Sequence, residues 1–277
     1  MNCFLHLDRQ KFLGKHRPWL EQEEVKNSLF LGLCAGFIDP ASMLMLEVSG
    51  RAPTLLVLQT TPKHNAILAA PQAAPSPMEE ASRIVFECQP GFPGVVGPRP
   101  LVASFANAYG ALSQKRPVLR MEQFIYRLDA VHLPPTVPGQ LRAAGPNDEP
   151  LLAGWLAAFS QEAMGEEMSD TAARRAFRQK LEHRELWVWD QHGIPRSMAG
   201  LARPTQRGIT INYVYTPPAS RGQGLAANTV AHLSQRQLDA GYSFCSLYTD
   251  AQFPTSNALY QRLGYYQVCE SEMYGFE

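Results

Sequence analysis

The sequence predicts an α+β fold, in which a mixed, mostly antiparallel sheet is flanked by helices and the arrangement occurs twice. Its 277 residues exceed the length of one average domain. Apolar residues make up 45% and charged residues 18%, a balance that excludes wholesale disorder. In the second half, strand-like segments come first and helices then alternate with strands, which is typical of layered α+β domains.

A proline-rich segment over residues 133–150 divides the chain. It contains five prolines and two glycines, which oppose both a helix and a central strand. We therefore expect an N-terminal domain over 1–132, a linker over 133–150 and a C-terminal domain over 151–277. Residues 141–143 are expected to pair as a short first strand of the second domain.

The second half carries clear periodicities. Residues 151–164 have a helical apolar stripe, and Asp170 is expected to cap a second helix that ends near residue 183. Further strands are expected over 186–190, 197–202, 209–216 and 244–249, and a further helix over 224–240. A short helix and a final strand complete this half.

The first half has weaker patterns, in an order that resembles the second half and is compatible with an ancient duplication. Helices are expected over 19–33 and 100–114. Strands are expected over 43–48, 54–60, 65–70, 83–88 and 121–131.

Charge and composition exclude several classes of function. Lysines and arginines number 25 and acids number 25, so we expect neither a nucleic-acid partner nor an anionic membrane surface. The longest apolar stretch, residues 29–38, is half the length that spans a bilayer, and the first residues do not resemble a signal peptide. The five cysteines form no CxxC pair and the histidines show no metal spacing, so we expect reduced thiols, a cytoplasmic protein and no metal.

The sharpest motif is a glycine-rich loop that follows a β-branched strand and two prolines and opens a helix. Two glycines allow a tight turn and a close approach to a ligand. The free N–H groups of the first helical turn, with the helix dipole behind them, form an anion site that suits a pyrophosphate. The residues of this loop are Arg221, Gly222, Gln223, Gly224, Leu225 and Ala226.

Two common phosphate-binding motifs do not match this loop. A P-loop ends in Gly-Lys-Ser/Thr, whereas this loop ends in Gly-Leu-Ala. A dinucleotide fingerprint needs a third glycine within a parallel βαβ unit, but Asn228 stands near that place and the preceding strand follows a meander.

The loop and its surroundings resemble the GNAT superfamily of acyl-CoA-dependent N-acyltransferases. The family's pyrophosphate motif, Gln/Arg-x-x-Gly-x-Gly/Ala, matches Arg221, Gly224 and Ala226. Its second motif, Asn-x-x-Tyr-x-x-x-Gly-Phe/Tyr, matches at residues 257–265. The resemblance covers residues 141–277 and implies a three-layer α/β/α GNAT fold, with the C-terminal copy intact.

The resemblance implies acetyl-CoA as co-substrate and assigns roles to particular residues. Tyr260 is the expected general acid for the departing thiolate, and Asn257, three residues before it on the same helix face, lines the thiol end of the pantetheine. Backbone donors over Val214, Tyr215 and Thr216 are expected to hold the thioester carbonyl and the pantetheine amides.

The general base has no clear candidate in the sequence. Many family members have a glutamate on the strand before the loop, but residues 209–215 contain no acid. Asp250 ends the next predicted strand and is the candidate base, with a turn cap as its alternative role. Three acids in one loop, Glu162, Glu166 and Glu167, could instead attract a cationic amine or be solvated surface.

Residues 91–100 take the position expected for a second pyrophosphate loop in a duplicated domain, between the strand predicted over 83–88 and the next helix. They lack the motif, and Pro98 and Pro100 remove two donors. The first half therefore resembles a degenerate GNAT-like copy that packs on the catalytic domain and walls its acceptor cleft. A second acyl-CoA site in this half is the alternative.

The paired motifs favour an enzyme that moves an acetyl group from acetyl-CoA to a primary amine of a small-molecule or peptide acceptor. The alternative is an acyl-CoA-binding sensor or regulatory module without turnover. A scaffold built on an inactive fold conflicts with the intact loop. The sequence leaves the identity of the acceptor and the length of the acyl chain open.

Overall fold

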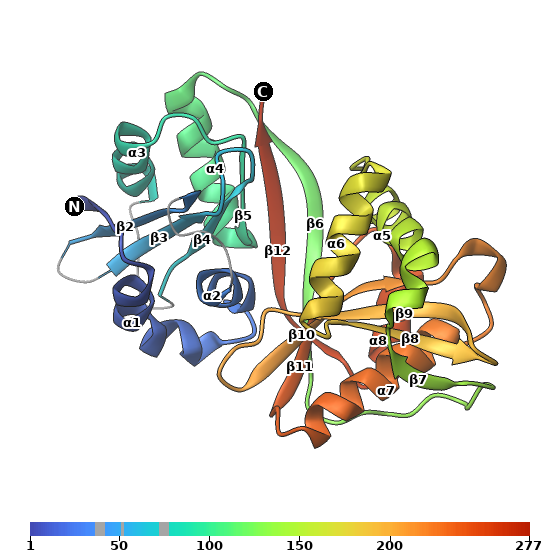
Figure 1. Cartoon of the computed structure of the whole chain (residues 1–277). Coiled ribbons are helices and arrows are strands. Elements are labelled where there is room, and N and C mark those ends of the chain that lie inside the picture. Colours follow the sequence, from blue (N-terminus) through green and yellow to red (C-terminus); the bar gives the residue numbers. More distant parts are fainter. Residues whose placement is uncertain (37–41, 51–52, 72–77) are drawn as a thin grey trace. The chain divides into compact units, whose positions relative to one another are not determined.

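The computed structural model describes residues 1–36, 42–50, 53–71 and 78–277 (Figure 1). Contacts divide the chain into two compact units, which we call the N-terminal unit and the C-terminal unit. The N-terminal unit comprises Met1–Ile125, Thr249–Gln252 and Gln267–Glu277. The C-terminal unit comprises Tyr126–Tyr248 and Phe253–Tyr266.

The N-terminal unit contains a sheet in the order β1-β2-β3-β4-β5-β12. Neighbouring strands are antiparallel except β4 and β5, which are parallel. The strands are β1 (Asn2–Leu5), β2 (Leu44–Ser49), β3 (Pro53–Gln59), β4 (Ala66–Ala69), β5 (Gly94–Pro98) and β12 (Tyr266–Phe276). The helices are α1 (Arg9–Leu20), η1 (Glu21–Glu23), α2 (Ser28–Ala35), α3 (Met78–Cys88) and α4 (Arg99–Ser113). Strand β6 (Pro117–Leu128) contributes residues to both units.

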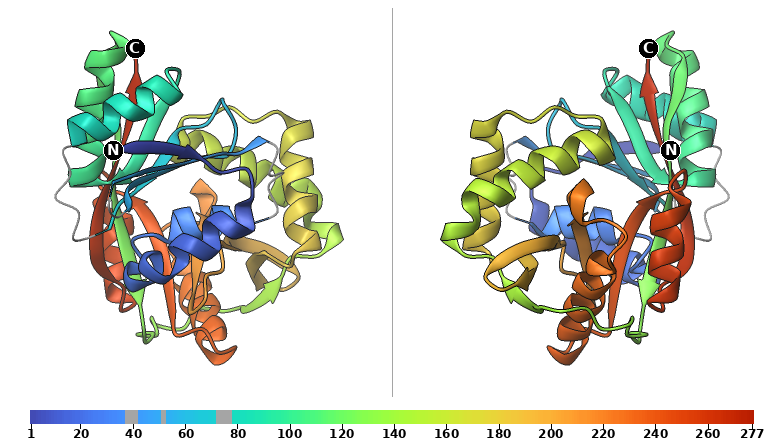
Figure 2. Two further views of the ribbon diagram at one scale, coloured as in Figure 1. Left: turned by 90° about the vertical axis from the view of Figure 1, so that its left-hand side faces the viewer. Right: turned by 90° about the vertical axis from the view of Figure 1, so that its right-hand side faces the viewer.

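Helices cover both faces of this sheet (Figure 2). Alternate residues of a strand face opposite sides, and along β3 Leu55 and Val57 join a core with α3 and α4. Leu56 and Leu58 join a second core with α1 and α2. Because both faces are buried, β3 is a continuous apolar run and the unit has three layers.

The C-terminal unit contains a sheet in the order β7-β8-β9-β10-β11, antiparallel except between β10 and β11. Its strands are β7 (Gln140–Ala143), β8 (Leu186–Gln191), β9 (Ile194–Ala202), β10 (Gly208–Tyr215) and β11 (Phe244–Asp250). Its helices are η3 (Pro146–Asp148), α5 (Glu149–Met164), α6 (Asp170–Glu182), η4 (Pro218–Ser220), α7 (Leu225–Asp239) and α8 (Pro254–Arg262).

Helices also cover both faces of the second sheet. Helices α5 and α6 share a core with Val188 of β8 and Met198 of β9. Helix α7 covers the other face (Figure 1). There the ring of His232 lies 5.2 Å from that of Trp189, and the Arg236 guanidinium lies over Trp187. This is the layered fold predicted from the sequence.

The two halves of the chain repeat one order of elements, so the predicted duplication is confirmed. The first copy runs β1-α1-α2-β2-β3-β4-α3-β5-α4-β6 and the second runs β7-α5-α6-β8-β9-β10-α7-β11-α8-β12. The compact units differ from the predicted domains, because β12 belongs almost wholly to the N-terminal unit. The division into independently folding domains at 133–150 stays a prediction.

The proline-rich segment packs as part of the C-terminal unit. The carbonyl of Pro138 accepts hydrogen bonds from Trp189 and Gln191, at 2.9 and 2.7 Å. The strand predicted at 141–143 is confirmed as β7, which pairs with β8.

Several local predictions are wrong. Residues 83–88 belong to helix α3, not to a strand, because Ala81, Ile84 and Val85 form one buried helical face. The helix predicted over 19–33 is two helices separated at residues 21–27, and its first part begins at Arg9 with Asp8 as N-cap. Ser169, not Asp170, caps α6.

The position assigned to a second pyrophosphate loop is also wrong. Residues 91–100 form β5 and the start of α4, which correspond to β11 and α8 in the other copy. The counterpart of the glycine-rich loop lies between β4 and α3, and residues 72–77 of that segment lie outside the described residues.

Candidate functional site

The parallel strands β10 and β11 pair over only part of their length. Their register runs from Gly208 and Phe244 to Thr210 and Ser246, yet both strands continue beyond these pairs. The later residues of β10 are therefore not engaged in that ladder. An opening between two parallel strands exposes backbone donors and acceptors to a ligand that lies along the strand.

A bulge reshapes β10 beside this opening. Asn212 pairs with Gly200 and Tyr215 pairs with Met198, so β10 uses one more residue than β9 over this stretch. Tyr213 has a φ of 48°, an uncommon value for a residue with a side chain. The bulge interrupts the regular pairing of β10 with β9, next to the predicted thioester-binding residues.

The end of β10 is anchored by a chain of hydrogen bonds. The Thr216 hydroxyl donates to the Ser197 hydroxyl at 2.8 Å, and the latter donates to the Tyr215 carbonyl at 3.2 Å. Tyr215 is buried, whereas Val214 and Thr216 are half-buried. These contacts fix the backbone on which the thioester-binding donors are expected, and that role stays a prediction.

The glycine-rich loop has the conformation that its sequence predicts. Gly222 and Gly224 both have a φ of +76°, which favours glycine. Gly224 is the N-cap of α7, and no side chain in the described parts of the chain caps the first turn. A Cβ on Gly224 would also lie 3.2 Å from Val137. The first N–H groups of α7, beginning at the buried Leu225, are therefore available to an anion.

Asn228, which stands near the place of a third glycine, stabilises this loop. Its amide nitrogen donates to the carbonyls of Gly224 at 3.0 Å and Pro135 at 3.1 Å. The residue thus ties the loop to the proline-rich segment, and the prolines become part of the loop's support. Ala226 follows in the first turn of α7 and is half-buried.

Arg221 is held at the side of the loop by α5. Its Nη2 lies 2.7 Å from Glu162 Oε2, and its Nε donates to the Thr216 carbonyl at 2.9 Å. Glu162 is thus an ion-pair partner of Arg221, not a free acid awaiting a cation. Both side chains are half-exposed, so the pair positions the loop more than it stabilises the fold. Gln223, in the same turn, is exposed.

The second motif places Asn257 and Tyr260 on the buried face of α8, as predicted. Tyr260 is 9% exposed, and burial raises its pKa to about 12. Its hydroxyl forms no hydrogen bond within the described part of the chain. The Asn257 amide donates to the Phe253 carbonyl at 3.0 Å, which fixes the first turn of the helix.

The last residues of this motif lock α8 to its neighbours. The hydroxyls of Tyr265 and Ser234 lie 2.8 Å apart in the core, so α8 is joined to α7. Gly264 has a φ of +99°, and a Cβ there would lie 2.7 Å from the Ala130 carbonyl. The Gly-Tyr pair therefore holds the orientation of the helix that carries Tyr260.

Asp250 lies at the end of β11, and its Oδ1 accepts the Gln252 N–H at 2.8 Å. This is the turn-capping contact considered in the sequence analysis. The contacts of residues 249–252 place Asp250 with the N-terminal unit, whereas the other predicted site residues belong to the C-terminal unit. Its role as a base stays a prediction.

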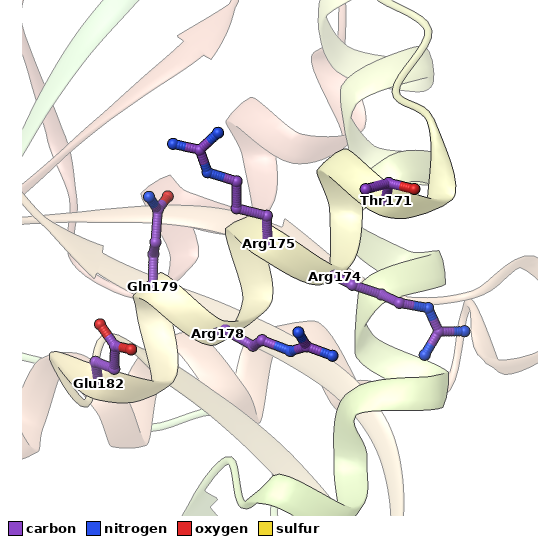
Figure 3. A pocket seen from close by; sticks show the side chains of 6 residues that line it. All are labelled: Thr171, Arg174, Arg175, Arg178, Gln179 and Glu182. Carbon is purple, nitrogen blue, oxygen red and sulfur yellow. The ribbon is translucent and has the colours of Figure 1, made fainter.

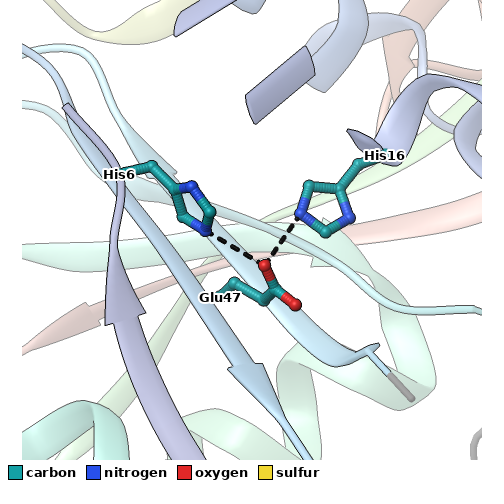
Figure 4. A group of neighbouring side chains, drawn as sticks. All are labelled: His6, His16 and Glu47. Carbon is teal, nitrogen blue, oxygen red and sulfur yellow. Dashed lines mark hydrogen bonds and ion pairs between the residues drawn. The ribbon is translucent and has the colours of Figure 1, made fainter. Parts of the chain in front are cut away.

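A cluster with metal-ligating side chains lies in the N-terminal unit (Figure 4). His6 and His16 each place Nε2 about 3 Å from Glu47 Oε2, at 3.0 and 3.1 Å. Lys15 bonds both carboxylate oxygens, at 2.9 and 2.7 Å, and Trp19 donates to His16 Nδ1. A lysine ammonium at both oxygens opposes a divalent cation, so we assign this cluster to the stability of the fold.

The arginine-rich surface of α6 is an open helix face (Figure 3). Its side chains all leave one helix, and Arg178 pairs with Glu149 at 2.8 Å. Arg174 pairs with Asp170 at 2.8 Å. This surface does not include the loop, β10 or α8.

Two residues near β10 were missed in the sequence analysis, Arg203 and Asn212. Each has a buried side-chain atom, Nε and Oδ1 respectively, that finds no hydrogen-bond partner among the residues that the structure describes. No local sequence motif marks either residue, because whether these atoms find a hydrogen-bond partner depends on the neighbouring strands.

Comparisons with known proteins agree with this geometry. Residues 155–275 match the sequence profile described as acetyltransferase (GNAT) domain. A search among curated proteins gave no significant match. No helix in the ranges that the structure describes has the length and apolarity to cross a bilayer.

Solved structures share the fold along the whole chain. A GNAT-family acetyltransferase from Colwellia psychrerythraea is 12% identical, with all of both chains covered and a TM-score of 0.62. A GCN5-related N-acetyltransferase from Kribbella flavida is 15% identical over 91% of this chain and 94% of that one, with a TM-score of 0.62.

A tandem GNAT protein from the clavulanic acid biosynthesis pathway is 13% identical over 99% of this chain and 97% of that one, with a TM-score of 0.59. Identities this low establish the fold alone, and the sequence profile identifies the domain that it matches. The chain therefore contains a GNAT domain at residues 155–275, and its whole length has the fold of a tandem GNAT protein.

Proposed function

We propose that the protein transfers an acetyl group from acetyl-CoA to a primary amine. The observation that carries this proposal is the pairing, within the C-terminal unit, of an uncapped helix N-terminus behind Gly222 and Gly224 with the buried phenol of Tyr260. The first feature suits a pyrophosphate and the second suits a departing thiolate.

In this proposal acetyl-CoA lies along the opening between β10 and β11. The pyrophosphate accepts N–H donors from the loop, whose residues are Arg221, Gly222, Gln223, Gly224, Leu225 and Ala226. Backbone N–H groups of Val214, Tyr215 and Thr216 bind the pantetheine amides and the thioester oxygen, which gains negative charge during attack. Asn257 lies beside the sulfur.

The amine nitrogen attacks the thioester carbon, the N–C bond forms and the C–S bond breaks. The electron pair of the broken bond goes to sulfur, which takes a proton from Tyr260. The amine loses one proton, so the proton gained by CoA is balanced and Tyr260 is reprotonated. Because burial raises its pKa to about 12, Tyr260 stays protonated at neutral pH and is available as the donor.

We propose Asp250 as the group that accepts the amine proton, directly or through a water. The acceptor is a small-molecule or peptide amine, and we expect the protein to act in the cytoplasm, in keeping with its five free thiols.

Calorimetric titration of acetyl-CoA and CoA into the wild type and an Arg221→Glu, Gly224→Trp double variant tests the binding step. We expect one micromolar site per chain in the wild type and none in the variant. The matched control is Gly165→Ala, another glycine with positive φ, at the end of α5. Absence of binding to the wild type would refute the proposal.

Turnover is tested by thiol release with a broad amine panel, for the wild type and Tyr260→Phe. Release that depends on the amine and falls in Tyr260→Phe supports an acetyltransferase. Binding of acetyl-CoA that survives Tyr260→Phe, with no release for any amine, would instead identify an acyl-CoA sensor.

A further inference from the structure

Arg203 follows the last residue of β9 and reaches across the sheet. The centre of its guanidinium lies 5.2 Å from the ring centroid of Tyr248 on β11. Because β10 lies between β9 and β11, the guanidinium lies over β10. Arg203 has a φ of +49°, a conformation in which residues with side chains are strained and which is concentrated at functional sites.

The face of the sheet on which Arg203 lies can be identified from β10 and β11. The hydroxyls of Thr210 and Ser246 lie 3.1 Å apart, so these paired residues share a face. Two residues further along each strand, Asn212 and Tyr248 lie on that same face. Arg203, Asn212 and Tyr248 therefore surround one patch, just beyond the last paired residues of β10 and β11.

Within the described residues Arg203 has no counterion, whereas several other arginines of this chain have one. The arginines that pair with carboxylates include Arg99, Arg127, Arg142, Arg174, Arg178 and Arg221. In the described part of the chain Arg203 has no ion pair, and its buried Nε donates to no acceptor. Burial lowers the pKa of its guanidinium, which nevertheless stays protonated at neutral pH. Arg203 as a whole is half-buried, but a buried N–H of a cation that has no acceptor is costly unless a ligand supplies one.

Asn212 is a second unpartnered group on this face. Its Oδ1 is buried and accepts no hydrogen bond. The oxygen lies so close to β9 that a Cβ on Gly200 would stand 2.6 Å from it. Arg203 thus lacks an acceptor and Asn212 lacks a donor, and an amine that also carries an anion offers both.

We propose that the acceptor amine carries a carboxylate, which Arg203 binds, while Asn212 accepts a hydrogen bond from the amine end. This inference rests on the proposed acetyl transfer, since it names the substrate class of that site. The planar guanidinium fork matches a carboxylate in two parallel hydrogen bonds. A single positive charge balances a carboxylate, whereas a phosphate dianion calls for further cations.

The inference is tested with pairs of amines that differ only in the carboxylate: free amino acids against their carboxamides, and lysine against cadaverine. The variants are Arg203→Met, which keeps the length of the chain, and Arg203→Lys, which keeps the charge. Arg175→Met, on the exposed face of α6, is the matched control. Acetyl-CoA binding by each variant, measured by calorimetry, shows whether the fold and the cofactor site are intact.

Arg203→Met is expected to lower kcat/KM for carboxylate-bearing amines by about 10- to 100-fold, mainly through KM, as for a lost hydrogen-bonded charge. Carboxamides and cadaverine should be unaffected, and Arg203→Lys should lie between the wild type and Arg203→Met. Comparing each variant with the wild type on the same amine cancels differences in amine basicity. An equal loss for both members of each pair, or no loss, would overturn the inference.

Failure of the acetyl-transfer proposal can be told apart from failure of this inference. If no amine releases CoA, the amino acids are titrated into the wild type and Arg203→Met by calorimetry. Binding to the wild type that Arg203→Met loses and Arg175→Met keeps would support the inference alone. Absence of binding to the wild type would overturn it, and stronger binding of inorganic phosphate than of any amino acid would do the same.

Discussion

The two units repeat one fold, but a charged group inside each unit has different partners. In the N-terminal unit, Glu47 is 1% exposed and is bonded by Lys15, His6 and His16. In the C-terminal unit, Arg203 Nε and Asn212 Oδ1 have no hydrogen-bond partner among the described residues, and Arg203 has no carboxylate partner there. A buried polar group that the protein itself satisfies stabilises the fold, whereas one that it leaves unsatisfied is available to a ligand.

The units also differ in the connection between β10 and α7 and its counterpart between β4 and α3. Between β10 and α7 the chain has Gly222 and Gly224, both with positive φ. The corresponding segment, residues 70–77, has three prolines and no glycine. Prolines lack the N–H that an anion needs, so the sequence of this segment offers fewer backbone donors than the glycine-rich loop does. The comparison predicts one acetyl-CoA site per chain.

The largest expected effect on activity comes from Tyr260→Phe. The substitution removes the proton donor without emptying the core, so kcat should fall by about 10²- to 10⁴-fold while acetyl-CoA binding stays unchanged. Thiol-release kinetics and calorimetry measure the two quantities. The control is Tyr109→Phe, a buried tyrosine of the N-terminal unit, for which kcat should be unchanged. Equal kcat in Tyr260→Phe and the wild type would remove Tyr260 from the mechanism.

The largest expected effect on stability comes from Glu47→Ala. The substitution leaves Lys15, which is 53% exposed, and two histidines around an empty position, and loss of the partner of the buried His16 imidazole costs about 1–3 kcal/mol. Native-state hydrogen exchange along β2 and β3 measures the loss. Acetyl-CoA binding by the C-terminal unit should persist under conditions in which the protein stays folded. Unchanged exchange would show that the cluster contributes nothing to the fold.

A smaller effect on stability is expected from alanine at Gly224 of the glycine-rich loop, and the same substitution at Gly165 serves as the comparison. Gly224→Ala and Gly165→Ala both place a side chain at positive φ, at +76° and +69°. Each should cost about 1–2 kcal/mol of unfolding free energy. Only Gly224→Ala should also weaken acetyl-CoA binding, because only that loop is expected to carry the pyrophosphate. Equal affinities of the two variants would place the anion elsewhere.

The smallest expected effect is the change in stability of the N-terminal unit with pH. Burial acts to raise the pKa of Glu47, but the bond from Lys15 and the nearby histidines outweigh it and hold that pKa below its usual range. Burial lowers the pKa of His16, against the attraction of Glu47.

Both shifts destabilise the N-terminal unit in acid. Below the unfolded histidine pKa of about 6.5, the unfolded chain binds a proton that folded His16 does not. The contribution of Glu47 is present above the unfolded pKa of about 4.3 and is lost as pH falls through its folded pKa. The protection factors of β2 amides, which divide out the pH dependence of intrinsic exchange, should therefore fall between pH 7.5 and 5.5, and His16→Gln should flatten that fall. Protection factors that do not change with pH would contradict the assignment.

The local geometry of the candidate site could be predicted because its signals are local, whereas the roles of its residues stay predictions. The glycines at 222 and 224 and the spacing of Asn257 and Tyr260 depend only on backbone freedom and on the helical period, and the structure has both as predicted. The strand predicted over residues 83–88 is wrong because a short apolar run is compatible with a strand or a helix, and only the packing of α3 decides between them.

The sequence by itself determined the fold class and the loop, because periodicity, glycine and proline act within a few residues, and its pattern was compatible with a duplication. The tertiary structure alone decided that β12 belongs with the N-terminal unit and that Arg203 has no counterion among the described residues. The reason is physical: strand partners and the burial of a charge depend on residues far apart in the chain, and no local pattern records which of them meet.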